Sequence, residues 1–141
     1  MSKPQFPKEF EALRVLVVDD EEEIRDLVQQ ILRDMGIVRV HLAENGEMAW
    51  QRLSRTELDY DLVISDWLMP RMDGFEVASL IRHDERLKDI PIIVFSGMEL
   101  DAEQSETVNQ YTAGIINKTD LDHEDRLTEL LGSLITVKPA S

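Results

Sequence analysis

Five polar residues in this sequence each follow a short, nearly continuous apolar run. They are Asp19, Asp20, Asp66, Ser96 and Lys118. Apolar runs of this length, rich in valine and isoleucine, are typical of strands that are buried on both faces of a parallel sheet. Because ligands bind beyond the carboxyl ends of such strands, we expect these side chains to converge at one edge of a sheet.

Three carboxylates crowded at one edge repel one another, which raises their pKa values unless a cation neutralises them. A hard divalent ion does so, and Mg²⁺ typically takes one or two carboxylates together with water and phosphate oxygens. Lys118 could pair with another phosphoryl oxygen, and a carboxylate can be the nucleophile that forms an aspartyl-phosphate. These residue types therefore indicate phosphoryl transfer, whose catalysis is mostly positioning and charge neutralisation.

Each of these features alone has an ordinary structural explanation. An Asp-Asp pair at a helix start usually caps the helix, a lone lysine after a strand is usually a solvated charge, and Ser96-Gly97 is a common turn sequence. Their joint occurrence in order, each at the end of an expected strand, favours a shared site.

The composition is that of a one-domain globular protein. Its 141 residues suit one domain, and 43% of them are hydrophobic, which is enough for one core. No apolar run approaches the ~20 residues that span a bilayer, and the first residues lack the apolar stretch of a signal peptide. Since cysteine is also absent, we expect a cytoplasmic protein without disulfides or thiolate zinc sites.

The chain is strongly acidic. It has 29 acidic and 15 basic residues, a formal net charge of −14. Such a surface repels nucleic acid and anionic lipid headgroups, whose binding depends on lysine and arginine. We therefore expect no direct nucleic-acid or membrane binding, and partners that are metal ions or proteins with basic patches.

Strand and helix patterns alternate along the chain. Strands are expected at residues 13–18, 37–42, 61–65, 90–95 and 114–117, and helices at about 19–35, 45–55, 73–83, 101–111 and 120–135. Five strand–helix pairs predict right-handed crossovers around one parallel sheet, a three-layer α/β domain. We expect a loose leader at 1–12, one domain at 13–135 and a tail at 136–141.

Two segments resemble the response-regulator receiver domains of two-component signalling. Val17-Val18-Asp19-Asp20-Glu21 resembles their acidic pair, and residues 66–74 (DWLMPRMDG) are similar to their phosphoacceptor loop, D-x-x-M-P-x-M-D-G. Ser96 and Lys118 stand where that family has a Ser or Thr and a Lys. The resemblance covers roughly residues 13–135 and implies a flavodoxin-like, doubly wound sheet in the order 2-1-3-4-5.

The resemblance also implies roles. Asp66 would accept a phosphoryl group, and Asp20 and Asp66 would bind Mg²⁺ (or Mn²⁺) directly with the backbone carbonyl of Leu68, while Asp19 acts largely through water. Lys118 and Ser96 would contact phosphoryl oxygens and act as the switch.

The same resemblance implies partners. The donor would be a histidine kinase or a histidine phosphotransfer protein, and a downstream protein effector would recognise the surface of the fourth helix and fifth strand. We expect a monomer or weak dimer, and no turnover of a separate substrate as an enzyme.

Four positions depart from the family pattern or from its common variants. Thr119 replaces the proline that usually follows the lysine, so we expect a trans peptide bond between residues 118 and 119. Ile115 replaces the usual aromatic switch residue; Tyr111 is the nearest aromatic candidate for that role, and ordinary packing is the favoured explanation for Tyr111. Leu68 and Met98 occupy the positions that tune hydrolysis, and neither can orient water, which predicts a long-lived phosphoryl group.

Trp67 is expected to be a partly exposed neighbour of the site and a fluorescence reporter of Mg²⁺.

Two other functions remain as alternatives. A phosphatase with an aspartyl nucleophile would need a D-x-D-x-[TV] motif, which Asp19-Asp20-Glu21 does not match. A pseudo-receiver would keep the fold as a binding module without being phosphorylated. The sequence leaves the pathway, the cognate kinase, the output partner and the oligomeric state undetermined. It also leaves open whether this is a complete single-domain regulator or a fragment of a longer protein.

Overall fold

One parallel sheet organises the chain. The computed structural model describes residues 12–55, 57, 59–67, 69, 72–97, 101–118 and 123–137. Within them, five strands pair in the order β2-β1-β3-β4-β5. The strands are β1 (Arg14–Val18), β2 (Arg39–Ala43), β3 (Leu62–Ser65), β4 (Ile92–Ser96) and β5 (Gly114–Asn117). The expected strand order is confirmed.

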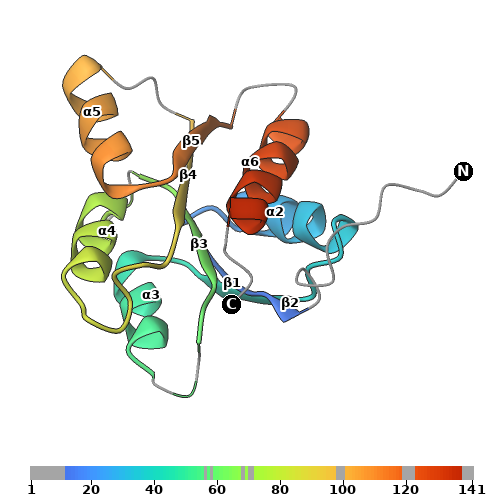
Figure 1. Cartoon of the computed structure of the whole chain (residues 1–141), viewed down its shortest axis with the longest axis horizontal. Coiled ribbons are helices and arrows are strands. Elements are labelled where there is room, and N and C mark those ends of the chain that lie inside the picture. Colours follow the sequence, from blue (N-terminus) through green and yellow to red (C-terminus); the bar gives the residue numbers. More distant parts are fainter. Residues whose placement is uncertain are drawn as a thin grey trace, which may run out of the picture.

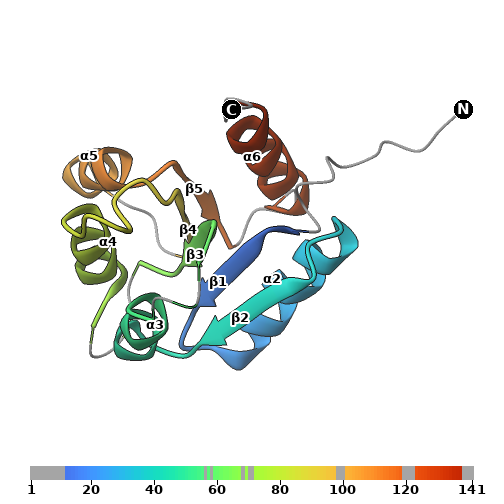
Figure 2. The same cartoon turned by 60° about the horizontal axis from the view of Figure 1, so that its bottom comes forward.

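Helices cover both faces of this sheet. They are α2 (Glu22–Asp34), α3 (Gly46–Leu53), α4 (Gly74–Arg82), α5 (Ala102–Tyr111) and α6 (His123–Val137). Helices α3, α4 and α5 lie on one face, and α2 and α6 on the other (Figure 1 and Figure 2). This is the three-layer, doubly wound α/β architecture of the flavodoxin type that the sequence predicts.

The core consists of two apolar clusters, one on each face of the sheet. Neighbouring strand residues contribute to opposite clusters: Leu16 and Val63 lie under α3 and α4, while Val17 and Ile64 lie under α2 and α6. Side chains alternate along a strand, so a strand covered on both faces needs apolar residues at every position. Residues of β3 and β4 are therefore all buried.

Side-chain caps begin three of the helices. The side chains of Asn45, Asp73 and Asp101 each accept a hydrogen bond from the backbone N–H three residues later, at 2.8–2.9 Å. Asp101 forms a complete capping box with Gln104. These caps follow β2, β3 and β4, so α3, α4 and α5 all begin at the carboxyl edge of the sheet, where the candidate residues stand.

Some boundaries differ from those expected. Helix α2 begins at Glu22, after a loop at residues 19–21, and its end is followed by Gly36 with a φ of +97°. Strand β2 begins at Arg39, two residues later than expected. The expected leader and tail fall almost wholly outside the described residues and stay predictions, although α6 continues to Val137. Among the described residues, no helix is both long and apolar enough to span a membrane.

Candidate functional site

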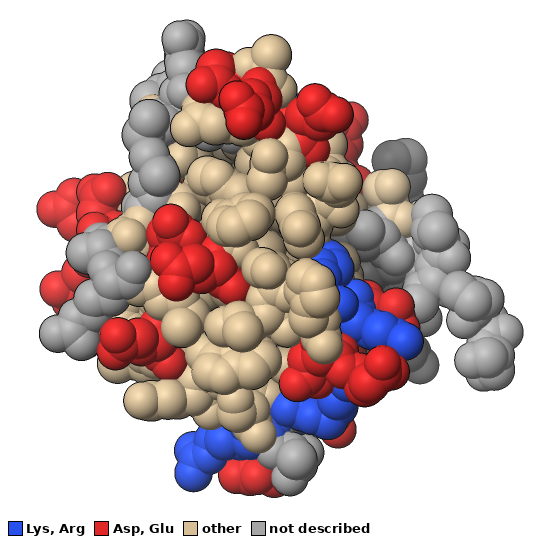
Figure 3. Space-filling model, turned by 90° about the vertical axis from the view of Figure 1, so that its left-hand side faces the viewer, with Lys and Arg blue, Asp and Glu red and all other residues tan. Residues whose placement is uncertain are grey.

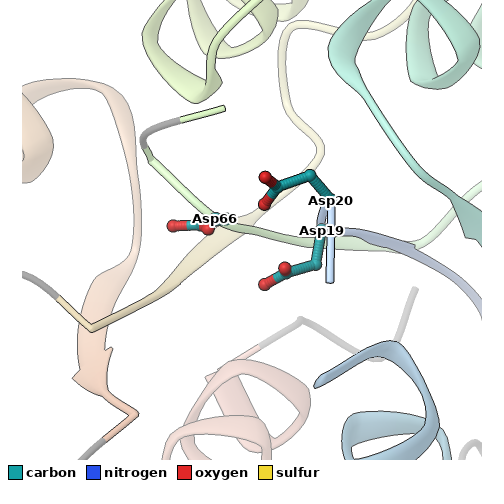
Figure 4. Close-up of side chains that lie close together, drawn as sticks. All are labelled: Asp19, Asp20 and Asp66. Carbon is teal, nitrogen blue, oxygen red and sulfur yellow. The ribbon is translucent and has the colours of Figure 1, made fainter. Parts of the chain in front are cut away.

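The carboxyl ends of β1 and β3 bring three aspartates together. Asp19 and Asp20 follow β1, and Asp66 follows β3. One carboxylate oxygen of each lies within 4.8 Å of the others, and the three carboxylates project to the same side of the strand ends (Figure 4). Asp19 and Asp66 are buried, whereas Asp20 is exposed. The convergence expected from the sequence is present for this trio.

Lys118 reaches the same point from the end of β5. Its ammonium Nζ lies 2.8 Å from Asp19 Oδ2 and 3.1 Å from Asp66 Oδ2, and only 10% of its side chain is exposed. Glu21 Oε1 lies 3.7 Å from the same nitrogen. The ammonium therefore bridges two buried carboxylates.

Burial and charge act against each other in this group. Burial raises the pKa of the Asp19 carboxyl, although contacts with Lys118 and with the Glu21 amide act in the opposite direction. Burial by itself would lower the pKa of Lys118, but its contacts with Asp19 and Asp66 outweigh that and raise it. Lys118 is held as a cation, and one ammonium faces several carboxylates.

Backbone hydrogen bonds hold Asp66 in place. Its N–H donates to the Val18 carbonyl at 2.9 Å, and its Oδ1 accepts from the Trp67 N–H at 2.8 Å. The Ser65 hydroxyl donates to the Asp66 carbonyl at 2.8 Å. Asp66 therefore has one carboxylate oxygen against the backbone and the other against Lys118.

Gly74 lets the first turn of α4 approach Asp66. Its N–H donates to the Trp67 carbonyl at 2.9 Å. A Cβ at this position would lie 2.3 Å from the Asp66 carbonyl oxygen and 2.8 Å from the Trp67 Cα, both backbone atoms that cannot turn aside. The Asp73-Gly74 pair of the motif therefore combines a cap with the one residue that this approach permits.

Asp19 is fixed equally well. Its Oδ1 accepts from the Glu21 N–H at 2.9 Å, its carbonyl accepts from Arg25 Nη1 at 2.7 Å, and its N–H donates to the Ala43 carbonyl at 3.1 Å. Asp20 has no such restraint and faces solvent. The result is a set of oxygen donors with one open side.

The donor set suits a hard divalent cation. Carboxylate oxygens are the ligands that Mg²⁺ uses, usually with several retained waters. Lys118 supplies one positive charge, whereas the group contains three carboxylates. The negative charge of the group is therefore only partly compensated. The described residues therefore fit Mg²⁺ in both chemistry and charge.

Ser96 ends β4 next to this group. It is buried, it pairs in register with Asn117, and its carbonyl accepts from the Lys118 N–H at 2.9 Å. Its backbone is thereby tied to that of Lys118, so the two expected switch residues are neighbours.

The remaining expected positions divide into two kinds. Leu68, Met98 and Thr119 lie outside the described residues, so their expected roles stay predictions, as does the trans bond after Lys118. Ile115 is half-buried on β5 and packs against the apolar cluster under α3, α4 and α5.

One expectation about this region is wrong. Trp67 is buried, with 6% of its surface exposed, and is not partly exposed. Its ring meets that of Phe75 edge to face, with centroids 5.9 Å apart. The sequence led us to expect Trp67 only as a loop neighbour of Asp66, and Phe75 was not predicted to contact it. The position of Phe75 directly after the motif glycine Gly74 could have indicated this contact.

Known proteins share this sequence pattern and this geometry. The family model described as "Response regulator receiver domain" matches residues 15–131. The chain belongs to this family. It is 33% identical over 105 residues to the chemotaxis protein CheY1 of Helicobacter pylori. The aligned region covers 74% of this chain and 82% of that protein.

Solved structures agree with the family assignment. Chemotaxis protein CheY4 of Vibrio cholerae has a TM-score of 0.75 and 29% identity, covering 86% of this chain and 97% of that one. Response regulator protein TrrA of Thermotoga maritima, in complex with Mg²⁺ and beryllium fluoride, has a TM-score of 0.72 and 34% identity, covering 86% and 98%. This chain is thus a receiver domain of the two-component type with an acidic pocket, and such domains are generally signalling modules.

Proposed function

We propose that Asp66 accepts a phosphoryl group with the help of Mg²⁺. The observation that carries this proposal is the Lys118 ammonium, which lies between Asp19 and Asp66 beside a group of three carboxylates. A phosphoryl group on Asp66 would add oxygens that Lys118 and a divalent cation can both contact. The same contacts would stabilise the charge that spreads over the phosphoryl oxygens in the transition state.

Besides Mg²⁺, the reaction needs only a phosphoryl donor. A carboxylate oxygen of Asp66 forms the bond to phosphorus while the P–N bond of a phosphohistidine in the donor protein breaks. The donor imidazole keeps the electron pair and takes up a proton. The donor is a histidine kinase or a histidine phosphotransfer protein, and no separate substrate is turned over.

The proposed cation ligands are Asp20, Asp66 and the backbone carbonyl of Leu68, with Asp19 acting through water. Mg²⁺ supplies charge neutralisation at the phosphoryl oxygens, and Mn²⁺ can substitute for it. The TrrA structure with Mg²⁺ and beryllium fluoride supports this, since that protein shares 34% of its sequence with this chain. Asp20 is exposed and unrestrained, so it can move to meet an ion.

Signalling then follows from Ser96 and Lys118. Both would contact phosphoryl oxygens, and the movement would change the surface of α5 and β5 for an effector protein. Ile115 has no ring to turn inward, so this readout differs from the family's usual one. Leu68 and Met98 would not orient water, so the phosphoryl group would be long-lived.

Acetyl phosphate tests the chemistry. We expect Mg²⁺-dependent addition of one phosphoryl group to the wild-type chain by intact-protein mass spectrometry, and none in Asp66→Asn. Circular dichroism controls for folding of the variant. An unmodified wild type that also fails to bind beryllofluoride would support the pseudo-receiver alternative instead.

The lifetime of the phosphoryl group is tested separately. We expect slow loss of label from the purified wild-type chain, and faster loss from Leu68→Asn, whose amide could hold a water molecule. Loss from the wild type within seconds would contradict the roles of Leu68 and Met98.

A further inference from the structure

Helices α4 and α5 expose apolar side chains beside each other. Phe75 and Leu80 on α4 have 39% and 36% of their surface exposed. The Phe75 ring meets the Tyr111 ring of α5 edge to face, with centroids 5.5 Å apart. We call the outer face formed by Phe75, Glu76, Glu103 and Tyr111 the α4–α5 surface. Helix α5 lies beside α4, and β5 lies along another side of α5 (Figure 1).

The charged residues of this surface are acidic. Glu76, Glu103 and Glu106 are exposed, and among the described residues no basic side chain lies within ion-pair distance of them. Helix α5 contains no lysine or arginine. Figure 3 shows a broad uncharged area on this side of the molecule, with acidic groups around it and basic groups along the bottom and right of the view.

The one arginine of α4 is turned toward the backbone. Arg82 Nε donates to the Tyr111 carbonyl at 2.9 Å, and its Nη1 donates to the carbonyls of Lys88 and Ile90 at 2.9 and 2.7 Å. These bonds fasten the end of α4 to the end of α5. They also use the guanidinium, so it does not neutralise the glutamates of the α4–α5 surface.

This surface is in direct contact with the phosphoacceptor loop. The Trp67 N–H donates to Asp66 Oδ1, and the Trp67 ring packs against Phe75 at 5.9 Å. Phe75 in turn packs against Tyr111. A change in the hydrogen bonding of Asp66 therefore acts on a residue that touches the α4–α5 surface, without the aromatic that Ile115 replaces.

We propose that the α4–α5 surface docks a basic amphipathic segment of a partner protein. Its apolar side chains would cover Phe75 and Tyr111, because aromatic residues that become buried dominate binding energy. Its lysine or arginine residues would face Glu76 and Glu103, which fixes orientation and speeds association. A second copy of this chain is a poorer match, because each copy has a formal net charge of −14 and would bring like charges together here.

The docking itself does not depend on phosphorylation. Its regulation does, and in that respect the inference rests on the proposed function of Asp66. It names a second output surface, distinct from the surface of α5 and β5, and the chemistry of its partner, with Trp67 and Phe75 as the positioning residues between the site and that surface.

A designed peptide tests the docking. The probe is an amphipathic helix of about four turns, with leucines on one side and lysines flanking them, and its control has glutamates in place of the lysines. We expect the basic peptide alone to bind, weakly at high salt, with amide chemical-shift changes in α4 and α5. Changes centred on Gly114, Ile115 and Leu130 instead, or equal binding of both peptides, would overturn the proposal.

Substitutions test which residues of the α4–α5 surface contribute to peptide binding. Phe75→Ala should weaken binding of the basic peptide by about tenfold, and Glu76→Lys, which removes no apolar contact, should also weaken it. Leu27→Ala is the matched control, because Leu27 is exposed to a similar extent, 37%, on α2. Equal affinities for wild type, Phe75→Ala and Glu76→Lys, each folded by circular dichroism, would overturn the proposal.

Beryllofluoride with Mg²⁺ separates regulation from docking. We expect it to change the Trp67 environment, read as fluorescence of a Trp50→Phe variant, and to change peptide affinity in wild type but not in Phe75→Ala. If beryllofluoride fails to bind, the proposed function of Asp66 fails while the peptide result stands. If it binds and leaves peptide affinity unchanged, the coupling through Trp67 and Phe75 is wrong.

Discussion

The two ends of the sheet carry charged residues in opposite ways. At the carboxyl edge, the buried Asp19 and Asp66 face the Lys118 side chain, of which 10% is exposed. At the amino edge, Arg14 and Arg39 are register partners on β1 and β2, and no carboxylate of the described residues lies within ion-pair distance of either guanidinium.

The amino edge keeps its interior neutral. His41 Nδ1 and Tyr60 Oη share a hydrogen bond of 2.6 Å, and their rings meet edge to face at 5.4 Å. Burial raises the pKa of Tyr60, and burial together with Arg14 and Arg52 lowers the pKa of His41. Both shifts favour the uncharged forms of the half-buried His41 ring and the buried Tyr60 hydroxyl.

This difference shows which property identifies the site. Both edges contain like charges close together, but only the carboxyl edge buries them with incomplete compensation. Taking a charge out of water is costly unless a partner or metal is present. A cation relieves that cost at the carboxyl edge, whereas water already does so at the amino edge.

Removing the central cation should have the largest effect. Lys118→Met leaves Asp19 and Asp66 buried without their ammonium, and we expect a loss of about 3–5 kcal/mol in the free energy of unfolding. Urea unfolding at neutral pH without Mg²⁺ measures it. Lys88→Met is the control: its ion pair with Glu85 is solvent-exposed, so its loss should stay below ~1 kcal/mol. Equal losses would remove the contrast between buried and solvated charge.

Mg²⁺ should stabilise the chain through the carboxyl edge. At a free concentration ~100 times its Kd, a ligand of the folded state adds about 2.7 kcal/mol. Thermal unfolding with and without Mg²⁺ measures the effect, which Asp20→Asn should abolish. Asp61→Asn, at the amino edge, should retain it. A response that survives Asp20→Asn and disappears in Asp61→Asn would reverse the assignment of the two edges.

A methyl group at Gly74 should separate α4 from Asp66. Gly74→Ala places its Cβ against the Asp66 carbonyl, so we expect a loss of about 1–3 kcal/mol, as for overpacked sites. Gly97→Ala provides the comparison, because its Cβ would meet only Lys118 side-chain atoms at 3.6 and 3.9 Å. Chemical unfolding of both variants decides this, and similar stability of the two would mean that the α4 start is not so constrained.

The amino edge should respond to acid through His41, with the smallest effect. Its pKa is lowered in the folded state, so folding favours the neutral ring. That contribution is complete above the unfolded value of about 6.5 and is lost as the pH falls toward the folded value. Wild type should therefore lose more stability than His41→Gln between about pH 7 and pH 5, a range that includes the ordinary pKa of histidine. Parallel pH profiles would show that folding does not lower the pKa of His41.

The sequence alone determined the five strands, the family and the members of the acidic group, whereas the strand order was predicted only through the resemblance to that family. Continuous apolar runs require two covered faces, and the motif from Asp66 to Gly74 occurs at a strand end with the spacing of a phosphoacceptor loop. Local patterns carry this information because strand burial, caps and turns depend on residues near in sequence.

Tertiary structure decided how those residues meet. That Lys118 contacts both Asp19 and Asp66 depends on the pairing of β5 with β4 and of β3 with β1, across 99 and 52 residues of chain. The burial of Trp67 and the ring contacts from Trp67 through Phe75 to Tyr111 depend on how α4 packs between the sheet and α5. No local pattern reports such distances, because they are set by packing between elements that are far apart in sequence.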